Sequence, residues 1–268
     1  MKYATLLLLL TLSIPLSYIA SSPAYSDELS DAFMEQQETG NGVCVHKKSA
    51  LHRSDFSLNI ERFSRDGKVF YEFTEHGKGD YGKYEDVMWD ITAEMEEQEG
   101  LLYTNFSVRI IRDRDNNILI KYEKKFDYDK GKICYAATDG EGNIIKKKTF
   151  PIKGVTTDNN IMTHFLKAFV AHRGEKKYRS FYLISSEPKL YRINIKIIGS
   201  EVLELPRGQV EAIKIRLIPD LGLLTGLSGA VIPPTFIWYT EESPYVWLQY
   251  EGLETGLGSA HILVYITS

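Results

Sequence analysis

The chain has 268 residues and a formal net charge of −4, with 17 tyrosines, 12 phenylalanines and only 2 cysteines. A chain without a strong excess of positive charge lacks the electrostatic footprint of a nucleic-acid binder, so we exclude nucleic acid as a partner. The aromatic content favours strands, because large flat side chains pack well on a pleated, half-buried surface.

The first 26 residues have the pattern of a secretory signal peptide. Lys2 gives a positive end, residues 6–19 are apolar, and the small residues Ala24 and Ser26 precede Asp27. A membrane anchor is the alternative, but the apolar segment is short for a bilayer span and no charged stop-transfer flank follows it. We therefore expect cleavage near Asp27, giving a soluble periplasmic protein with no transmembrane helix. No cysteine lies within the apolar segment or just after it, so we expect no lipid attachment.

Three segments are expected in the chain: the signal peptide at 1–26, a polar entry arm at 27–54 and a single β domain at 55–268. The arm is polar and irregular, and Gly40-Asn41-Gly42 is expected to break any regular structure in it. One domain is favoured over two because all-β chains of about 240 residues are often single domains.

From Asp55 onward, apolar and polar residues alternate, which is typical of strands with one buried face. Asp66-Gly67 joins the first two such segments and is the strongest short-range signal of a hairpin. Further alternating segments include 87–96, 106–110 with Phe106, Val108 and Ile110 as the apolar set, 118–122, 133–137, 191–197, 213–217, 236–239, 246–250 and 260–266. Roughly 11–13 strands exceed what a flat sheet holds without curling, so a mainly β fold is predicted, as a large curved antiparallel sheet or incomplete barrel.

One segment, at about 157–173, has helical spacing instead. Its apolar residues fall on a single helical face: Ile161, Met162, Phe165, Leu166, Phe169 and Val170. Thr157 or Asp158 can cap the start, and Gly174 stands where a left-handed C-terminal cap belongs. We expect this amphipathic helix to pack in the concavity of the sheet.

The connection at 218–234 is unusual because it is apolar and rich in glycine. Its large apolar residues are Leu221, Leu223, Leu224, Leu227, Val231 and Ile232. Loops are usually polar because they run over the surface, so this one either packs over the mouth of the sheet or contacts something apolar. In the second case it is a lid over a lipophilic ligand, or a patch for a membrane or a protein partner.

The two cysteines, Cys44 and Cys134, allow two interpretations. An exported chain meets an oxidising compartment, where a disulfide between them could form. Closing so long a loop would stabilise the fold by ~4–5 kcal/mol in the chain-entropy model. Two separate thiols, with Cys134 buried in a strand, are equally consistent with the sequence.

A calcium loop is suggested by Asp113, Asp115 and Asn117, which have the first ligand spacings of such a site. Its sixth position is Ile118 instead of glycine, and its twelfth is Lys124 instead of glutamate. A hairpin turn explains these residues better.

Other motifs also lack their structural context. Ser186 and Ser228 lie in sequences that resemble serine-enzyme motifs, but a proline interrupts the first and no strand-to-helix crossover surrounds the second. His46 and His52 near Cys44 fit no zinc spacing. We therefore expect no catalytic residue, no metal site and no cofactor.

The second half of the chain has a recognisable order of elements. A helix ending at 172–174 is followed by a strand at 191–195, a Pro-Arg-Gly turn at 206–208 and a tryptophan-containing strand at 236–239. Over roughly 155–267 this resembles a family of exported bacterial proteins of unknown function. The resemblance implies a curved antiparallel sheet with one central helix and implies no chemistry. Large curved sheets around a helix also look similar to periplasmic lipoprotein carriers, whose concavity holds acyl chains.

These observations favour a non-enzymatic periplasmic protein that binds a lipophilic ligand or assists envelope assembly. The expected partner is a lipid or another apolar small molecule, or an envelope protein. The expected ligand-binding residues are Ile161, Phe165, Phe169, Leu221, Leu223, Leu224, Leu227, Val231 and Trp238. One alternative is a protein-interaction module with a fully packed core. A third hypothesis is a hydrolase with a site built from distant residues, for which the sequence offers no nucleophile, base and oxyanion set.

Overall fold

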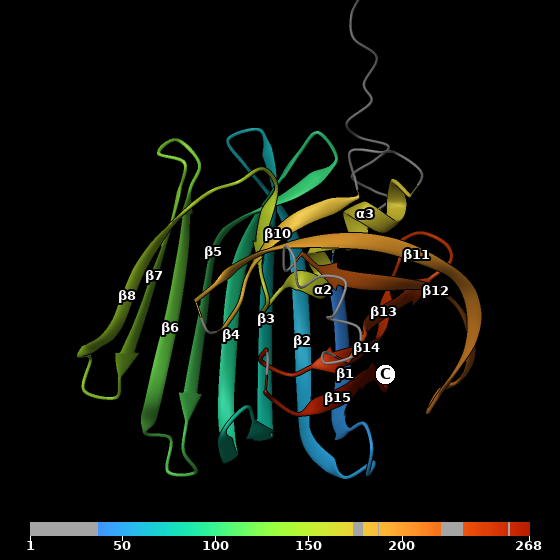
Figure 1. The fold of residues 1–268 in the computed structure, drawn as a ribbon, viewed down its shortest axis with the longest axis horizontal. Coiled ribbons are helices and arrows are strands. Elements are labelled where there is room, and N and C mark those ends of the chain that lie inside the picture. The colour runs from blue at the N-terminus through green and yellow to red at the C-terminus, as the bar shows by residue number, and fades with distance from the viewer. Residues whose placement is uncertain (1–36, 174–178, 187, 221–232, 257) are drawn as a thin grey trace, which may run out of the picture.

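Fifteen strands form one sheet that bends around two short helices (Figure 1). The predicted signal peptide lies outside the residues that the computed structural model describes, which are 37–173, 179–186, 188–220, 233–256 and 258–268. The strands are β1 (Gln37–His46), β2 (His52–Arg65), β3 (Lys68–Tyr81), β4 (Tyr84–Gln98), β5 (Leu101–Arg112), β6 (Ile118–Asp127), β7 (Lys132–Asp139), β8 (Ile144–Pro151), β9 (Thr156–Asp158), β10 (Ser180–Ile184), β11 (Leu190–Leu205), β12 (Gly208–Pro219), β13 (Thr235–Thr240), β14 (Trp247–Leu253) and β15 (His261–Ile266). The helices, α2 (Met162–Phe165) and α3 (Lys167–Ala171), follow β9.

Neighbouring strands of the sheet are mostly neighbours in sequence. The order across it is β8-β7-β6-β5-β4-β3-β2-β1-β15-β14-β13-β12-β11-β10-β9, and only β9 and β10 pair in parallel. β1 and β15 therefore meet inside the sheet, while its two free edges, β8 and β9, are consecutive in the chain. The predicted mainly β fold with a large, curved, unclosed sheet is confirmed, with more strands than the roughly 11–13 expected.

The described part of the predicted entry arm, residues 37–54, is not an irregular arm. It contains β1, which pairs with β2 on one side and with β15 on the other. The glycine at 42 is required by packing, because a Cβ there would lie 2.1 Å from Cζ of Phe56. Gly42 therefore allows close contact within a strand, whereas the sequence pattern predicts a break there.

The hairpins follow the predicted turns. Asp66 and Gly67 both have positive φ angles, 54° and 75°, as a two-residue hairpin loop requires, and Arg65 pairs with Lys68 on either side. The residues that resembled a calcium loop form the turn between β5 and β6. There the Asp113 carboxylate accepts hydrogen bonds from the backbone nitrogens of Asp115 (3.0 Å) and Asn117 (2.8 Å), which confirms the hairpin interpretation.

The orientation of β5 is opposite to the one that its apolar residues predict. Phe106, Val108 and Ile110 are only partly buried, whereas Ser107, Arg109 and other residues of the alternate set are buried. This strand therefore turns a charged residue toward the inside of the curve. The physical reason is a set of polar partners for Arg109, described below.

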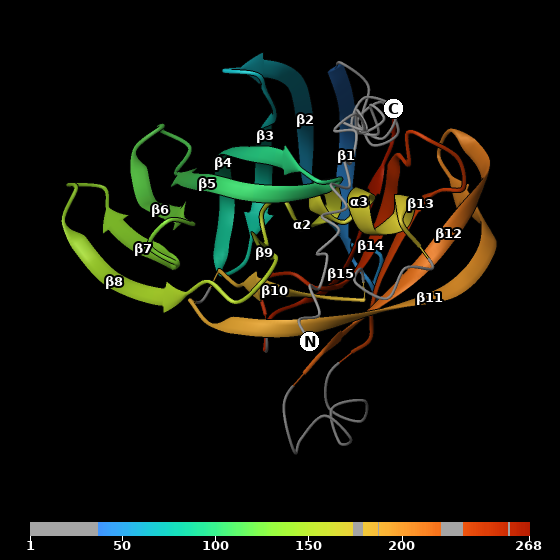
Figure 2. The same cartoon turned by 90° about the horizontal axis from the view of Figure 1, so that it is seen from above.

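The helical segment lies inside the curve of the sheet, as predicted (Figure 2). It is shorter than the predicted 157–173, because Leu166 separates α2 from α3. Two contacts fix its position: Lys167 forms an ion pair with Glu38 of β1, and the Tyr239 hydroxyl donates a hydrogen bond to the carbonyl of Thr163. The predicted C-terminal cap, Gly174, lies outside the described residues.

The prediction that Thr157 or Asp158 caps the helix is wrong. Both residues belong to β9, whose three residues are fully buried. The Thr157 hydroxyl lies 3.0 Å from that of Thr104 on β5, and Asp158 forms a buried ion pair with Lys124 on β6. The sheet therefore curls until its β9 edge packs against the inner face of β5 and β6. It stays unclosed because β7 and β8 extend beyond this seam (Figure 2).

The disulfide that the sequence allowed is not formed, since Cys44 and Cys134 are both free thiols. Cys44 lies on β1 and Cys134 on β7, with five strands between them in the sheet. Neighbouring strands are about 4.8 Å apart, so this separation is far beyond the reach of a disulfide. Of the two interpretations, that of separate thiols is correct, although the buried cysteine is Cys44 and Cys134 is only partly buried.

Candidate ligand-binding site

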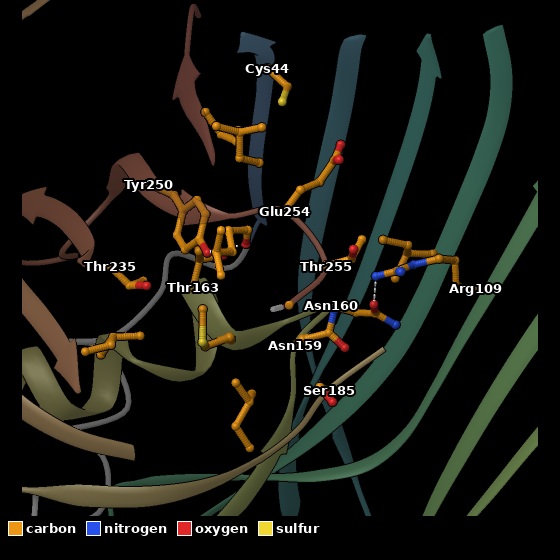
Figure 3. Close-up of a pocket in the computed structure, with 18 of the residues that line it drawn as sticks. Cys44, Arg109, Asn159, Asn160, Thr163, Ser185, Thr235, Tyr250, Glu254 and Thr255 are labelled. Carbon is orange, nitrogen blue, oxygen red and sulfur yellow. Dashed lines mark hydrogen bonds between the residues drawn. The ribbon is translucent and has the colours of Figure 1, made fainter. Parts of the chain in front are cut away.

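A cavity of about 310 Å³ lies between α2 and the concave face of the sheet (Figure 3). Its wall comes from strands that are far apart in the chain, among them β1 to β5 and β10 to β15. Its apolar lining includes Phe56, Trp89, Ile91, Met162, Leu183, Tyr191, Ile193, Leu217, Trp247, Leu253, Ile262 and Val264. The curvature of the sheet thus collects the inward face of many strands around one space.

Aromatic rings form a large part of this wall. The ring centroids of Tyr81 and Trp89 are 4.9 Å apart, and those of Phe56 and Trp247 are 6.2 Å apart. Trp89 fits only because residue 77, on the neighbouring strand β3, is a glycine. A Cβ at Gly77 would lie 2.0 Å from Cζ2 of the indole.

Arg109 is the buried cation of the cavity wall, with only 3% of its surface exposed. Its guanidinium donates hydrogen bonds to the side-chain oxygen of Asn160 and to the hydroxyl of Ser186, the latter at 3.2 Å. It also lies over the ring of Tyr81, 4.6 Å from the centroid. Figure 3 shows Arg109 and Asn160 on one side of the cavity, with Thr235 on the opposite side. The contacts with Asn160, Ser186 and Tyr81 hold the guanidinium plane in one orientation.

Glu75 lies near Arg109 in the same wall. One of its oxygens accepts a hydrogen bond from Nε1 of Trp89 at 2.8 Å. Burial raises the pKa of this carboxyl group, although the Trp89 hydrogen bond and the positive charge of Arg109 oppose that rise. Glu75 therefore binds a proton more readily than an exposed glutamate does.

A second carboxylate of the wall, Glu254, is already neutralised. Arg53 contacts both of its oxygens, at 3.1 and 3.4 Å, and the Glu254 side chain is 5% exposed. Burial raises the pKa of Glu254, and the Arg53 charge opposes this rise. Nearby, the Tyr250 hydroxyl donates to the carbonyl of Leu253 at 2.8 Å.

Two groups that could suggest catalysis, Cys44 and His164, are buried. Burial raises the pKa of the Cys44 thiol to about 12, so the nucleophilic thiolate is disfavoured. Burial also lowers the pKa of His164 well below its usual value, with a further contribution from Lys167. The His164 ring packs against Phe73 and Trp247, at centroid distances of 5.0 and 5.9 Å. Within the described ranges, no cluster of three His, Cys, Asp or Glu side chains could hold a metal ion.

The predicted ligand-binding residues that the structure describes do not line this cavity. Ile161, Phe165 and Phe169 are packed in the main core and do not line it. Trp238 is in a separate cluster with Leu248 and others, where its Nε1 donates to Glu201 at 2.7 Å. The five residues predicted from the apolar connection, Leu221, Leu223, Leu224, Leu227 and Val231, lie outside the described residues.

The sequence analysis missed the polar side of the cavity. Arg109 could have been noticed, because it lies within an alternating strand where one face must be buried. Asn160 and Ser186 carry no such signal, since they become neighbours of Arg109 only through the seam at β9. Trp89 and Ile91 were correctly predicted as the apolar face of their strand.

Comparisons with known proteins give one family. A family model described as "Protein of unknown function (DUF3108)" matches residues 121–261. None of the curated proteins matches the chain. No helix in the described part of the chain is both long and apolar enough to cross a bilayer.

Three solved structures are similar over most of their length. A β-barrel-like protein with the domain of unknown function DUF1849, from Brucella abortus, has 8% identity and a TM-score of 0.46, and the match covers 85% of this chain and 94% of that one. A structure described as an exported protein with a YmcC-like fold, from Bacteroides fragilis, has 5% identity and a TM-score of 0.33, with 88% and 95% covered. A structure described as a lipoprotein, from Parabacteroides distasonis, has 10% identity and a TM-score of 0.32, with 88% and 95% covered.

Proposed function

The chain belongs to the DUF3108 family of proteins of unknown function, and we propose that it is a non-enzymatic exported protein that binds one small, mainly apolar molecule. The cavity between α2 and the sheet is the observation that carries this proposal. Its volume of about 310 Å³ is at the lower end of the range of small-molecule sites, and its wall has the composition of such sites, apolar with a few fixed polar groups.

The volume favours a molecule with a single apolar chain over a lipid with two chains. Aromatic and aliphatic side chains would bury the chain of the molecule, since the removal of apolar surface from water is the main favourable term in such binding. Trp89, Ile193 and Leu217 are examples of the wall against which the chain would lie.

Export to the periplasm is proposed from the sequence pattern of residues 1–26. A protein that encloses an apolar molecule has an evident use in an aqueous compartment, because the free molecule would expose its apolar surface to water. Assistance in envelope assembly by carrying such a molecule is consistent with this proposal.

The chemistry of the wall supports binding over catalysis. A raised thiol pKa at Cys44 disfavours the nucleophile, and a lowered imidazole pKa at His164 makes this group a weak base. A hydrolase that used Cys44 as nucleophile and His164 as base would need each pKa to be shifted in the opposite direction.

Native mass spectrometry of protein purified from the periplasm without detergent tests this proposal. We expect a bound mass that organic extraction releases as a single-chain apolar compound. A clean apo mass, together with failure to take up any added single-chain amphiphile, would contradict the proposal and favour a protein-interaction module.

A matched pair of variants ties the bound molecule to this cavity. Val264 lines the cavity, whereas Leu263, the adjacent residue of β15, does not. Because adjacent strand residues point to opposite faces, Val264→Phe should fill the cavity and lose most of the bound mass, while Leu263→Phe should keep it. Equal retention by both variants would show that the molecule binds elsewhere.

A further inference from the structure

We propose that the molecule in the cavity carries an anionic head group, a carboxylate or a phosphate, and that Arg109 binds this group. The inference rests on the proposed function, because it requires the cavity to hold a ligand. It adds the chemical class of the ligand and its orientation, with the head group at Arg109 and the apolar chain along the aromatic wall.

Arg109 differs from the other buried cations of the described chain. Three basic side chains are fully buried: Arg109, Lys124 and Lys167. Lys124 forms an ion pair with Asp158, and Lys167 forms one with Glu38. The hydrogen-bond acceptors of Arg109, by contrast, are the neutral side chains of Asn160 and Ser186.

A guanidinium without a hydrogen-bonded counter-ion is costly to bury, because it cannot lose its proton as a lysine can. Among the described residues, Nε of Arg109 also has no hydrogen-bond partner. An anionic head group would supply a negative charge that is hydrogen-bonded directly to the guanidinium. Arginine presents donors in a planar fork that matches carboxylate and phosphate oxygens.

The neighbouring carboxylates have other hydrogen-bond partners, although the charge of Glu75 is close enough to interact with that of Arg109. Glu254 is bound by Arg53, and an oxygen of Glu75 accepts a hydrogen bond from Trp89. Burial raises the pKa of Glu75, so it can bind a proton when a ligand anion approaches and can then donate a hydrogen bond to that anion. Lys189, an exposed residue that also lines the cavity, adds positive charge there.

The orientation of Arg109 is fixed before any ligand binds. Asn160 and Ser186 hold two of its nitrogens, and the Tyr81 ring supports its flat face. A preorganised donor loses little freedom on binding, which favours affinity for a group of matching geometry. Figure 3 shows Arg109 and Asn160 together at one side of the cavity, and the head group would lie on that side.

The test compares three molecules with the same apolar chain: dodecanoate, dodecyl phosphate and dodecanol. Binding is measured by calorimetry or by tryptophan fluorescence, because Trp89 and Trp247 line the cavity. We expect at least one of the two anions to bind more tightly than the alcohol, by about tenfold to a hundredfold, as hydrogen bonds to a charged group would give. The preference between dodecanoate and dodecyl phosphate identifies the head group as carboxylate or phosphate.

Arg109→Gln should remove that preference, so that neither anion binds more tightly than dodecanol. Arg112→Gln is the matched control, because it removes the same charge from the same strand. Arg112 forms an ion pair with Asp90 and does not line the cavity. Arg109→Lys keeps the charge without the planar fork and should retain part of the preference.

The outcomes separate the inference from the proposed function. If the alcohol binds as tightly as both anions, the inference is overturned while the binding function stands. If none of the three binds to detergent-free protein, both fail. Circular dichroism checks the fold of each variant, and if Arg109→Gln does not fold, the comparison of anions with alcohol on the unaltered protein still decides.

Discussion

The two free edges of the sheet are protected in opposite ways. All three residues of β9 are buried against the inner face of β5 and β6, and Asp158 pairs there with Lys124. Seven of the eight residues of β8 are exposed, among them three consecutive lysines at 146–148. An unpaired strand edge can form hydrogen bonds with a strand of another chain. Burial of the edge prevents this association, and so do charged side chains on the edge. The β9 edge thus packs in the interior and helps to build the cavity, whereas the β8 edge only has to remain unpaired.

The β9 edge should be the more costly to disturb. Asp158→Ala leaves Lys124 buried without its counter-ion, which we expect to lower the free energy of unfolding by about 3–5 kcal/mol. Urea denaturation followed by fluorescence measures this loss.

The matched control for Asp158→Ala is the double variant Lys124→Met with Asp158→Leu. It removes both charges at once, so we expect it to be more stable than the single variant. A single variant that loses less than about 1 kcal/mol would mean that the pair behaves like an exposed one, in contradiction to its burial.

Removal of the charges from the β8 edge should lower the solubility of the protein and leave its stability nearly unchanged. Replacing Lys146, Lys147 and Lys148 by threonine removes charge from exposed positions, so we expect the free energy of unfolding to change by no more than about 0.5 kcal/mol per site. Light scattering at rising protein concentration should show association of the variant, because the edge is then uncharged and still unpaired. If the variant stays monomeric at every concentration, the lysines are not what protects the edge.

The smallest effect is expected in the turn before β8. There the Asp139 carboxylate accepts hydrogen bonds from Asn143, which together with other backbone donors lower its pKa. A lowered folded-state pKa stabilises the fold above the usual pKa of an aspartate, and this contribution is lost as the pH falls through the folded-state value. Asp139→Ala should therefore narrow the difference in melting temperature between neutral and acidic pH. An unchanged pH profile would show that these hydrogen bonds contribute nothing.

Local signals in the sequence correctly predicted the hairpins from β2 onward. Asp66-Gly67 needs no distant residue to form its turn, and alternation identified the inward face of β4 through Trp89 and Ile91. The same reasoning failed for β1, because its glycines are typical of a break in regular structure. Only the position of the Phe56 ring on the next strand shows why Gly42 is needed.

The candidate site was beyond the reach of such reasoning for a physical reason. Apolar residues predicted the face of β5 that contains Phe106, but long-range polar contacts stabilise the opposite face, where Arg109 lies. Asn160 and Ser186 reach Arg109 only after the sheet has curled and β9 has docked. A pattern within one strand holds no information about partners that a fold brings from elsewhere.

The pairing of β1 with β15 has a consequence for how the chain completes its fold. These strands are the first and the last that the structure describes, yet Cys44 lies opposite Val264 in their ladder, and both side chains line the cavity. During N-to-C synthesis or export, the cavity therefore cannot close until the final strand has emerged. A circular permutant, opened between β8 and β9 and joined near β1 and β15, would read across the sheet in strict order. It would turn the most distant pairing into a local one and should fold faster, because nearby contacts need less loop closure.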